Sequence, residues 1–336
     1  MKITAQAPCR VDLAGGTLDI WPLYLFHANA VTVNFAVNRY TSCELETRTD
    51  SKIVLRSRDL RKEEVFESLD ELRAARKYTL PLLAYLVKFF APDTGITLDT
   101  NSEAPAGAGI SGSSSLIITV SSALNKLTSS GYNIEKIREL SQNIEAQIIK
   151  VPTGCQDYYP AMYGGVSAIE LRADGLRRRE IECNVAELNK RIVLAYTGEP
   201  RNSGINNWEV TKLHIDGDKG VIKNFEKIAA ISYAMRKALE ADDWATVGKL
   251  LREEWANRRK NAPGITTPLI DRLIEGTRKA GALGGKVCGA GGGGCVFFLA
   301  ELGAQEKVAD AIRKEGAEVL PVTVAPQGVK VKVVSR

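Results

Sequence analysis

The feature that most restricts the fold of this chain is a glycine- and serine-rich stretch, Pro105-Ala-Gly-Ala-Gly-Ile-Ser-Gly-Ser-Ser-Ser-Leu116, which leads directly into the apolar segment 116–124. Glycines allow backbone N–H groups to approach an anion closely. The helix expected after them points its unsatisfied amides and the positive end of its dipole at the same place. The stretch therefore predicts a phosphate-binding loop; the alternative is a Gly/Ser-rich turn that caps a core helix.

Two common phosphate-binding patterns match this stretch only by its letters. Gly107, Gly109 and Gly112 spell G-x-G-x-x-G, but a dinucleotide fold needs a strand running directly into the first glycine and a second strand after the helix. Here the polar residues 101–105 separate the expected strand 95–99 from the loop, and 134–150 has helical periodicity. The pattern G-x-x-x-x-G-K-[ST] fails because Ser113 stands where lysine is required. The match to the G-x-G-x-x-G pattern is thus the only support for a nicotinamide oxidoreductase.

Length and composition favour a two-domain enzyme. The 336 residues are long for one core, and we expect domains at 1–185 and 186–336, divided in a polar link. A net charge of +5 without aromatic and basic interleaving disfavours a nucleic-acid surface. The apolar stretches are shorter than the roughly 18 residues of a membrane span, and a signal pattern is missing, so we expect a cytoplasmic protein. Six dispersed cysteines indicate reduced thiols.

Periodicity predicts mixed secondary structure. An antiparallel meander is expected early in the chain, and helices dominate later. Asn133 is a candidate helix cap, and Pro81 is expected to start or bend a helix. The expected strands are 1–8, 9–13, 30–37, 41–48, 52–56, 95–99, 165–171, 191–196, 295–300 and pieces within 319–334; the expected helices are 70–90, 113–127, 133–150, 221–240, 243–260, 268–280 and 306–315.

Three further stretches carry candidate chemistry. Ala14-Gly-Gly-Thr-Leu-Asp19 is either a tight bend presenting groups that bind hydroxyls or an ordinary turn. Val151-Pro-Thr-Gly-Cys-Gln-Asp157 breaks a helix and offers Asp157 at the start of the next element, where an isolated aspartate is usually a cap. Gly284-Gly-Lys-Val-Cys-Gly-Ala-Gly-Gly-Gly-Gly294 holds seven glycines in eleven residues. We expect this last run to lie against another backbone or a phosphate.

In this order, the stretches resemble the motifs of the GHMP kinases, the superfamily of galactokinase, homoserine kinase and mevalonate kinase. The resemblance covers the whole chain. The first motif is Ala7-Pro-Cys-Arg-Val-Asp-Leu-Ala-Gly-Gly-Thr-Leu-Asp19, in which Arg10 and Asp19 keep the nine-residue separation seen in galactokinases. Its Gly-Gly-Thr-x-Asp part, the Gly-x-Gln-Asp-x-Tyr segment around residue 157 and the glycine run are most similar to the branch of heptose phosphate kinases and fucose kinases. The resemblance implies an α+β fold, with an N-terminal domain like ribosomal protein S5 domain 2 and a ferredoxin-like C-terminal domain.

The resemblance also implies roles for individual residues. Asp157 would be catalytic with Arg10 beside it, and Ser113 and Glu145 would contact Mg²⁺. ATP would be bound by Pro105, Gly107, Ala108, Gly109, Ile110, Ser111, Gly112, Ser113 and Ser114. The sugar would be bound by Asp19, Gly16, Thr17, Gly154, Gln156, Gly289, Ala290, Gly291 and Gly292. A phosphate already present on the substrate would be held by a basic residue, for which Arg201, Arg258 and Lys286 are the candidates. One departure concerns the loop, because the family usually has Gly-Leu-Gly-Ser-Ser where this chain has Gly-Ile-Ser-Gly-Ser, which leaves the register of the metal ligand open by one residue.

The implied reaction is phosphorylation of a sugar or sugar phosphate, such as a heptose 7-phosphate, at its C1 hydroxyl. Phosphoryl transfer depends on positioning and charge neutralisation. Aspartate, with a reference pKa of about 3.9, is a weak base, and an anomeric hydroxyl is more acidic than other sugar hydroxyls. The alternatives are a kinase for fucose, galactose, a uronic acid or a mevalonate-type alcohol, and a non-catalytic ATP-binding regulator. Arg10 favours sugars, since mevalonate kinases tend to carry lysine there. The protein is expected to act as a monomer or homodimer.

Overall fold

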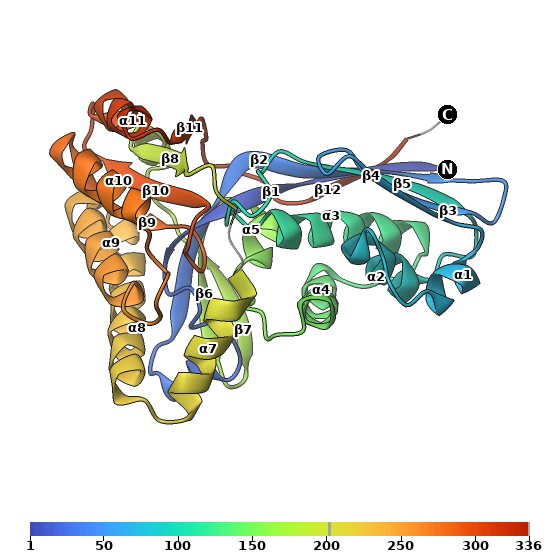
Figure 1. Cartoon of the computed structure of the whole chain (residues 1–336), viewed down its shortest axis with the longest axis horizontal. Helices are drawn as coiled ribbons and strands as arrows, with labels where there is room; N and C mark the ends of the chain where they lie inside the picture. Colours follow the sequence, from blue (N-terminus) through green and yellow to red (C-terminus); the bar gives the residue numbers. More distant parts are fainter. Residues whose placement is uncertain (201–202, 335–336) are drawn as a thin grey trace.

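The computed structural model describes residues 1–200 and 203–334, with the backbone alone described for 203–206. Eight strands form one sheet in the order β12-β1-β2-β5-β3-β4, with β6 paired to β2 and β7 to β6 (Figure 1). The pairs are antiparallel except for β3 with β5. The strands are β1 (Lys2–Ala14), β2 (Val31–Thr47), β3 (Ile53–Ser57), β4 (Lys62–Phe66), β5 (Ile96–Ser102), β6 (Val166–Arg172), β7 (Gly175–Glu180) and β12 (Lys330–Val334).

The two longest strands, β1 and β2, join the two halves of the molecule. The C-terminal part of β2 pairs with β5, whereas its N-terminal part pairs with β6. The sequence pattern predicted β1 as two pieces divided at Pro8, and β2 as two strands. Instead, β1 continues through a register shift between Pro8 and Cys9. A bulge accommodates a residue that has no N–H to donate, so proline does not end the strand.

Helices cover one face of the first part of this sheet (Figure 1). Ile117, Val120 and Leu124 of α3 are fully buried against strand residues such as Leu45 and Leu98. These contacts hold α3 against the sheet and fix the position of its N-terminus. The helices are α1 (Leu69–Ala74), α2 (Pro81–Phe90), α3 (Gly112–Leu127), α4 (Ile134–Ile149) and α5 (Tyr158–Tyr163).

The second sheet has the order β11-β8-β10-β9. Phe297 of β10 meets Phe35 of β2 edge to face, with ring centroids 5.6 Å apart, so one core is shared by both sheets. The strands are β8 (Ile192–Tyr196), β9 (Ala282–Val287), β10 (Cys295–Ala300) and β11 (Glu318–Leu320), and the helices are α8 (Lys219–Glu240), α9 (Trp244–Arg258), α10 (Pro268–Lys279) and α11 (Gln305–Lys314). Shorter or connecting elements are η1 (Leu23–Phe26), α6 (Val185–Asn189) and α7 (Ser203–Ile215).

Several elements differ from the expected ones. The segment 70–90 forms two helices, α1 and α2, and Pro81 begins the second. Strands β7 and β9 and helix α7 were not expected at all. Asn133 caps α4 as predicted, accepting a hydrogen bond from the Lys136 N–H. The last strand, β12, pairs with β1 in the first sheet, so the end of the chain returns to the N-terminal half. The domain boundary between residues 185 and 186 stays a prediction.

The glycine run lies directly on the phosphate-loop candidate. Cys295 N donates to Ala108 O at 2.7 Å, and a Cβ on Gly294 would meet that oxygen at 2.6 Å. The close backbone approach predicted from sequence is present, and it joins the end of the second sheet to the start of α3. None of the helices in the described part of the chain is long and apolar enough to cross a membrane.

Candidate active site

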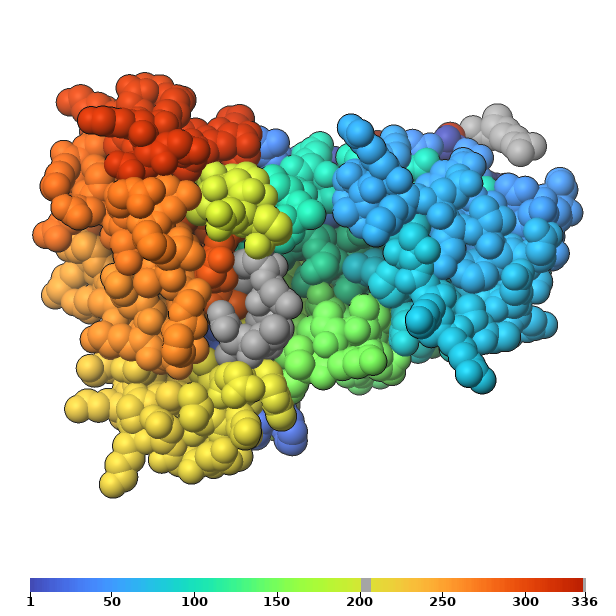
Figure 2. Space-filling view, viewed as in Figure 1, coloured from blue at the N-terminus to red at the C-terminus, as the bar shows by residue number. Residues whose placement is uncertain are grey.

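A pocket of about 470 Å³ opens where the two sheets meet. It is lined by the loop before α3, the β1–η1 loop, the α4–α5 region and the middle of the glycine run. Figure 2 shows the hollow in the middle of the molecule, between residues of the first half and those of the second. The motifs singled out in the sequence, which extend from residue 14 to residue 294, therefore meet at one cavity.

The loop before α3 has the conformation of an anion cradle. Gly107 and Gly109 have φ of 69° and 77°, in the left-handed region that glycine adopts without strain. Ser111 also has a left-handed φ, 61°, and α3 starts directly after it at Gly112. The helix has no side-chain N-cap, so no cap satisfies its first N–H groups. Its first residues line the pocket, and the positive end of the helix dipole is therefore available to an anion there.

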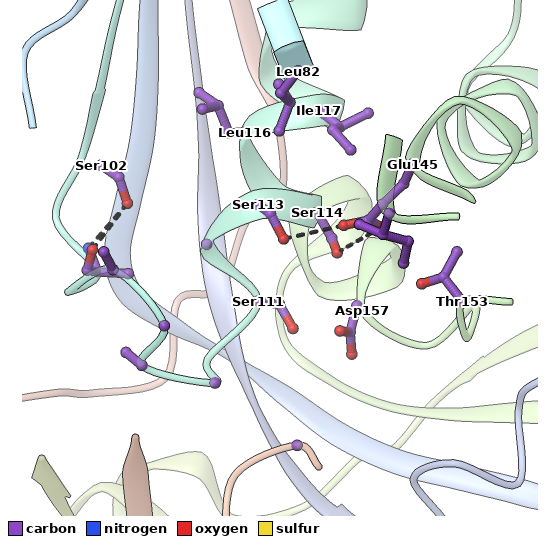
Figure 3. A pocket seen from close by; sticks show the side chains of 18 of the residues that line it. Leu82, Ser102, Ser111, Ser113, Ser114, Leu116, Ile117, Glu145, Thr153 and Asp157 are labelled. Atoms are coloured by element: carbon purple, nitrogen blue, oxygen red, sulfur yellow. Dashed lines mark hydrogen bonds between the residues drawn. The ribbon is translucent and has the colours of Figure 1, made fainter. Parts of the chain in front are cut away.

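Ser113, Ser114 and Glu145 form a small polar cluster beside the cradle (Figure 3). Ser113 Oγ donates to Glu145 Oε1 at 3.1 Å, and Ser114 Oγ to Oε2 at 3.4 Å. The Tyr158 hydroxyl also donates to Oε2. Burial raises the pKa of Glu145, although the Tyr158 bond acts in the opposite direction. A cation bound here would stabilise the carboxylate, and oxygen ligands of this kind suit Mg²⁺ shared with phosphates.

Arg10 and Asp157 form the central ion pair of the pocket. Arg10 Nε and Nη2 donate to Asp157 Oδ1 at 2.9 and 2.6 Å, and Nη1 donates to Gly109 O at 2.7 Å. Arg10 is 2% exposed, whereas 30% of the Asp157 side chain is accessible. Both bonds fall on Oδ1, and none of the described residues donates to Oδ2. Asp157 is the residue before α5 but makes no side-chain cap, so the ordinary role of an aspartate at that place does not apply.

Asp19 lies at the same end of the pocket. Its Oδ2 accepts from Gln156 N at 2.8 Å, and a Cβ on Gly154 would meet this oxygen at 2.2 Å. Glycine is thus required at 154 for Asp19 to be packed there. Burial, with a further contribution from Asp157, raises the pKa of Asp19 to about 6. Gln156 Oε1 is buried without a partner among the described residues, as expected of a group that awaits a ligand donor.

The Gly16–Thr17 turn is held from the second half of the chain. Arg258 Nη2 donates to Gly16 O at 2.6 Å and Nη1 to Thr17 Oγ1 at 3.3 Å. Thr17, with φ of 70°, donates to Asn207 Oδ1 at 3.2 Å. Nε of Arg258 donates to Glu254 at 2.7 Å. Because its donors are already used by the protein, Arg258 orders this turn.

A buried charge network behind the pocket was not predicted. Lys286 and Asp12 are both fully buried and form an ion pair, and Gly289 N donates to Asp12 Oδ1 at 2.9 Å. Asp12 also lies 3.7 Å from Arg10, and Lys286 lies 4.0 Å from Glu254. Burial opposes ionisation of Asp12, but Lys286 and Arg10 outweigh it and lower the pKa of Asp12. In the sequence, Asp12 and Lys286 are each a charged residue inside a motif, but neither their spacing nor their type indicated that they pair.

Some predicted site residues lie away from the cavity. Gly289 and Ala290 line the pocket, but Gly291 and Gly292 do not, since they pack against the backbone of 264–265. Ile110 is fully buried in the core and contributes its carbonyl, which accepts from Arg10 N at 3.0 Å. Arg201 lies outside the described residues.

The opposite end of the pocket is apolar, and no sequence motif indicated it. Figure 3 shows Leu82, Leu116 and Ile117 at this end, away from Asp157. Leu60, Leu80 and Leu83 complete it. These residues come from the β3–β4 turn, α2 and α3, so no motif connects them in the sequence.

Comparison with known proteins decides the family. Models of the GHMP kinases N terminal domain and of the GHMP kinases C terminal match residues 74–165 and 235–318, together just over half of the chain. The chain belongs to the GHMP kinases. It is therefore an ATP-dependent small-molecule kinase with the α+β GHMP fold, as the sequence motifs predicted.

Individual relatives cover nearly the full length. The chain is 28% identical over 98% of both chains to D-glycero-alpha-D-manno-heptose 7-phosphate kinase of Campylobacter jejuni, and 25% identical over 99% of both to mevalonate kinase of Pyrococcus furiosus. The structure of a D-glycero-D-manno-heptose 1-phosphate kinase from Bacteroides thetaiotaomicron matches with a TM-score of 0.79 at 22% identity, covering 99% of this chain and 100% of that one. At that identity the structural match supports the fold alone.

Proposed function

We propose that this GHMP kinase transfers the terminal phosphoryl group of ATP to the C1 hydroxyl of a sugar or sugar phosphate, with a heptose 7-phosphate as the leading candidate. The observation that carries the proposal is the Arg10–Asp157 pair. Two hydrogen bonds to Oδ1 fix the carboxylate, and Oδ2 remains to accept the proton of an attacking hydroxyl. The C. jejuni relative supports a heptose 7-phosphate.

At the acceptor end, the groups suit a polyhydroxylated ligand. Asp19 and Gln156 offer acceptors beside Asp157, and Thr17 and Asn207 offer further polar atoms. Arg10 and Arg258 are the cations that line the described pocket, and both are engaged by protein groups. We therefore assign a phosphate already present on the substrate to Arg201, a cation that lies outside the described residues.

At the donor end, the loop 105–114 would bind the triphosphate through its amides. Ser113 and Glu145 would hold Mg²⁺, whose positive charge offsets that of the phosphates. The contact between these two side chains supports Ser113 as the metal-side serine, because Ser111 takes the left-handed position usually given to glycine and Gly112 begins the helix. The apolar end around Leu80, Leu82 and Leu116 would take the adenine ring.

A mevalonate-type alcohol is the second candidate, because a mevalonate kinase is among the full-length relatives. Its acceptor is an aliphatic alcohol with a carboxylate. Asp19, a buried carboxyl group beside Asp157, would repel such a substrate, whereas it would accept hydrogen bonds from sugar hydroxyls. The position of Asp19 thus favours the sugar.

The test is ADP release from Mg·ATP across heptose 7-phosphate, unphosphorylated heptose, fucose, galactose, a uronic acid and mevalonate. We expect turnover with a sugar and highest kcat/KM for heptose 7-phosphate. Asp157→Asn should lose at least about 10²-fold in kcat, whereas Asp310→Asn on the surface of α11 should match the wild type. Absence of turnover with every sugar would contradict the proposal and leave mevalonate or a non-catalytic role.

Two further arms resolve the finer assignments. Transfer to C1 removes the reducing end, so the product should fail a reducing-sugar assay and be acid-labile; a product that still reduces would place the phosphate on another hydroxyl. Arg201→Ala should raise KM for heptose 7-phosphate and leave KM for unphosphorylated heptose unchanged. Equal effects on both would remove Arg201 from the phosphate subsite.

A further inference from the structure

Ser111 is an anomaly in the phosphate loop. Its φ of 61° and ψ of 37° place a residue with a Cβ in the left-handed region, which is strained for L-residues and free of strain for glycine. A glycine is the very next residue, at 112, where the backbone is helical and glycine has no such advantage. On backbone preference alone, glycine would be expected at position 111 and serine at position 112.

The Ser111 side chain is also unsatisfied. The residue is 7% exposed, and Oγ is buried without a hydrogen-bond partner among the described residues. It lines the pocket, and Figure 3 shows it leaving the loop on the side where Asp157 lies. A buried hydroxyl without a partner costs free energy. Strain and an unsatisfied hydroxyl at the same residue indicate a functional constraint that a ligand satisfies.

We propose that the Ser111 hydroxyl donates a hydrogen bond to the terminal phosphoryl group of ATP during transfer. Ser113 and Ser114 are occupied by Glu145, so among the serines of this loop that line the pocket, Ser111 is the one whose hydroxyl is left for the phosphoryl oxygens near Asp157. The role rests on the proposed kinase function and goes beyond it, since it assigns a catalytic residue where the family pattern has glycine.

Two substitutions separate the effect of the Ser111 hydroxyl from that of its backbone conformation. Ser111→Gly relieves the strain, so it should melt at the same temperature as the wild type or higher, while Ser111→Ala keeps the strain. Both lack the hydroxyl, and both should lose about 10- to 100-fold in kcat. If Ser111 were only a tolerated turn residue, Ser111→Gly would be as active as the wild type or more active.

Nucleotide affinity gives a readout that does not need the sugar. By titration calorimetry with Mg²⁺, both variants should bind the non-hydrolysable analogue adenylyl imidodiphosphate about tenfold more weakly and ADP within twofold of the wild type. Ser129 provides the matched control, because it is an exposed serine with φ of 52° just beyond the other end of α3. Ser129→Gly and Ser129→Ala should leave both affinities and kcat unchanged.

The outcomes are distinguishable from those of the sugar assay. Selective loss of analogue affinity in both Ser111 variants supports the role of Ser111 even if no sugar tested is phosphorylated. Wild-type analogue affinity and wild-type kcat in Ser111→Ala and Ser111→Gly overturn it, even if the sugar kinase activity is demonstrated. Equal loss of ADP and analogue affinity also overturns it, because the hydroxyl would then contact an inner phosphate.

Discussion

The buried pair of Lys286 and Asp12 gives the sharpest energetic prediction. Both side chains are fully buried, and removing one partner of such a pair costs about 3–5 kcal/mol because the other charge stays buried. In Lys286→Met, Asp12 keeps the Gly289 N–H and Arg10 at 3.7 Å. We therefore expect the lower end, about 3 kcal/mol, a large part of the roughly 5–15 kcal/mol that stabilises a typical protein.

The double variant Asp12→Asn/Lys286→Met removes both charges while asparagine still accepts from Gly289 N. It should cost about 1 kcal/mol, less than Lys286→Met alone, because replacing a buried pair by neutral groups is often close to neutral. Urea unfolding followed by tryptophan fluorescence measures both. Lys279→Met is the matched control, because Lys279 and Glu275 form an exposed pair on α10 expected to contribute less than about 1 kcal/mol.

Two results would refute this reasoning. A loss below about 1 kcal/mol in Lys286→Met would show that the pair is hydrated or dispensable. A double variant less stable than the single one would show that Asp12 contributes through its charge to Arg10 more than through Lys286. Either would also show that this network, formed by residues far apart in sequence, contributes less to stability than its burial suggests.

Three further predictions concern the sugar end and the histidines. Asp19, with a folded pKa of about 6, accepts from sugar hydroxyls best when ionised, so kcat/KM for sugar should fall as pH drops below 6, and Asp19→Asn should lack this pH dependence. Because the pKa of Asp19 is raised on folding, its contribution to stability is lost as pH rises through 6. Asp19→Asn should therefore be more stable than the wild type at pH 8 in chemical unfolding. Gly154→Ala should raise KM for sugar at least tenfold through the clash with Asp19 while calorimetry shows unchanged ADP affinity; unchanged KM would mean that Asp19 is dispensable. Burial lowers the pKa of both His27 and His214, whose Nε2 atoms lie 2.8 Å apart, so melting temperature should fall as pH drops below the unfolded pKa of about 6.5, and His27→Phe/His214→Phe should show a smaller fall.

Sequence patterns predicted the fold where local signals agree with the tertiary structure. Asn133 caps its helix and α3 starts within a residue of its expected position, because capping and helical periodicity are local. β9 was missed because Gly284 and Gly285 disfavour a strand. The structure shows their reason, since a Cβ on Gly285 would meet Phe298 at 2.4 Å and one on Gly284 would meet Gly248 O at 2.5 Å. Such a requirement belongs to the packing and is not visible in the sequence.

The candidate site divides in the same way. Arg10, Asp19 and Asp157 were found because each stands in a motif whose spacing is preserved, and the structure brings all three to the pocket. Their roles stay proposals. The partners of Asp12 and Thr17 could not be inferred, because Lys286 and Arg258 are more than 240 residues away. The apolar end of the pocket was missed for the same reason, since its residues belong to three separate elements.

The central claim is that Asp157, held by Arg10, promotes phosphoryl transfer from ATP to a sugar hydroxyl. The most direct measurement is single-turnover transfer from ATP labelled in its terminal phosphate to heptose 7-phosphate, comparing wild type with Asp157→Asn. We predict labelled sugar phosphate with the wild type and at least about 10²-fold slower transfer with the variant at unchanged nucleotide affinity. Equal transfer rates in the two proteins would contradict the account.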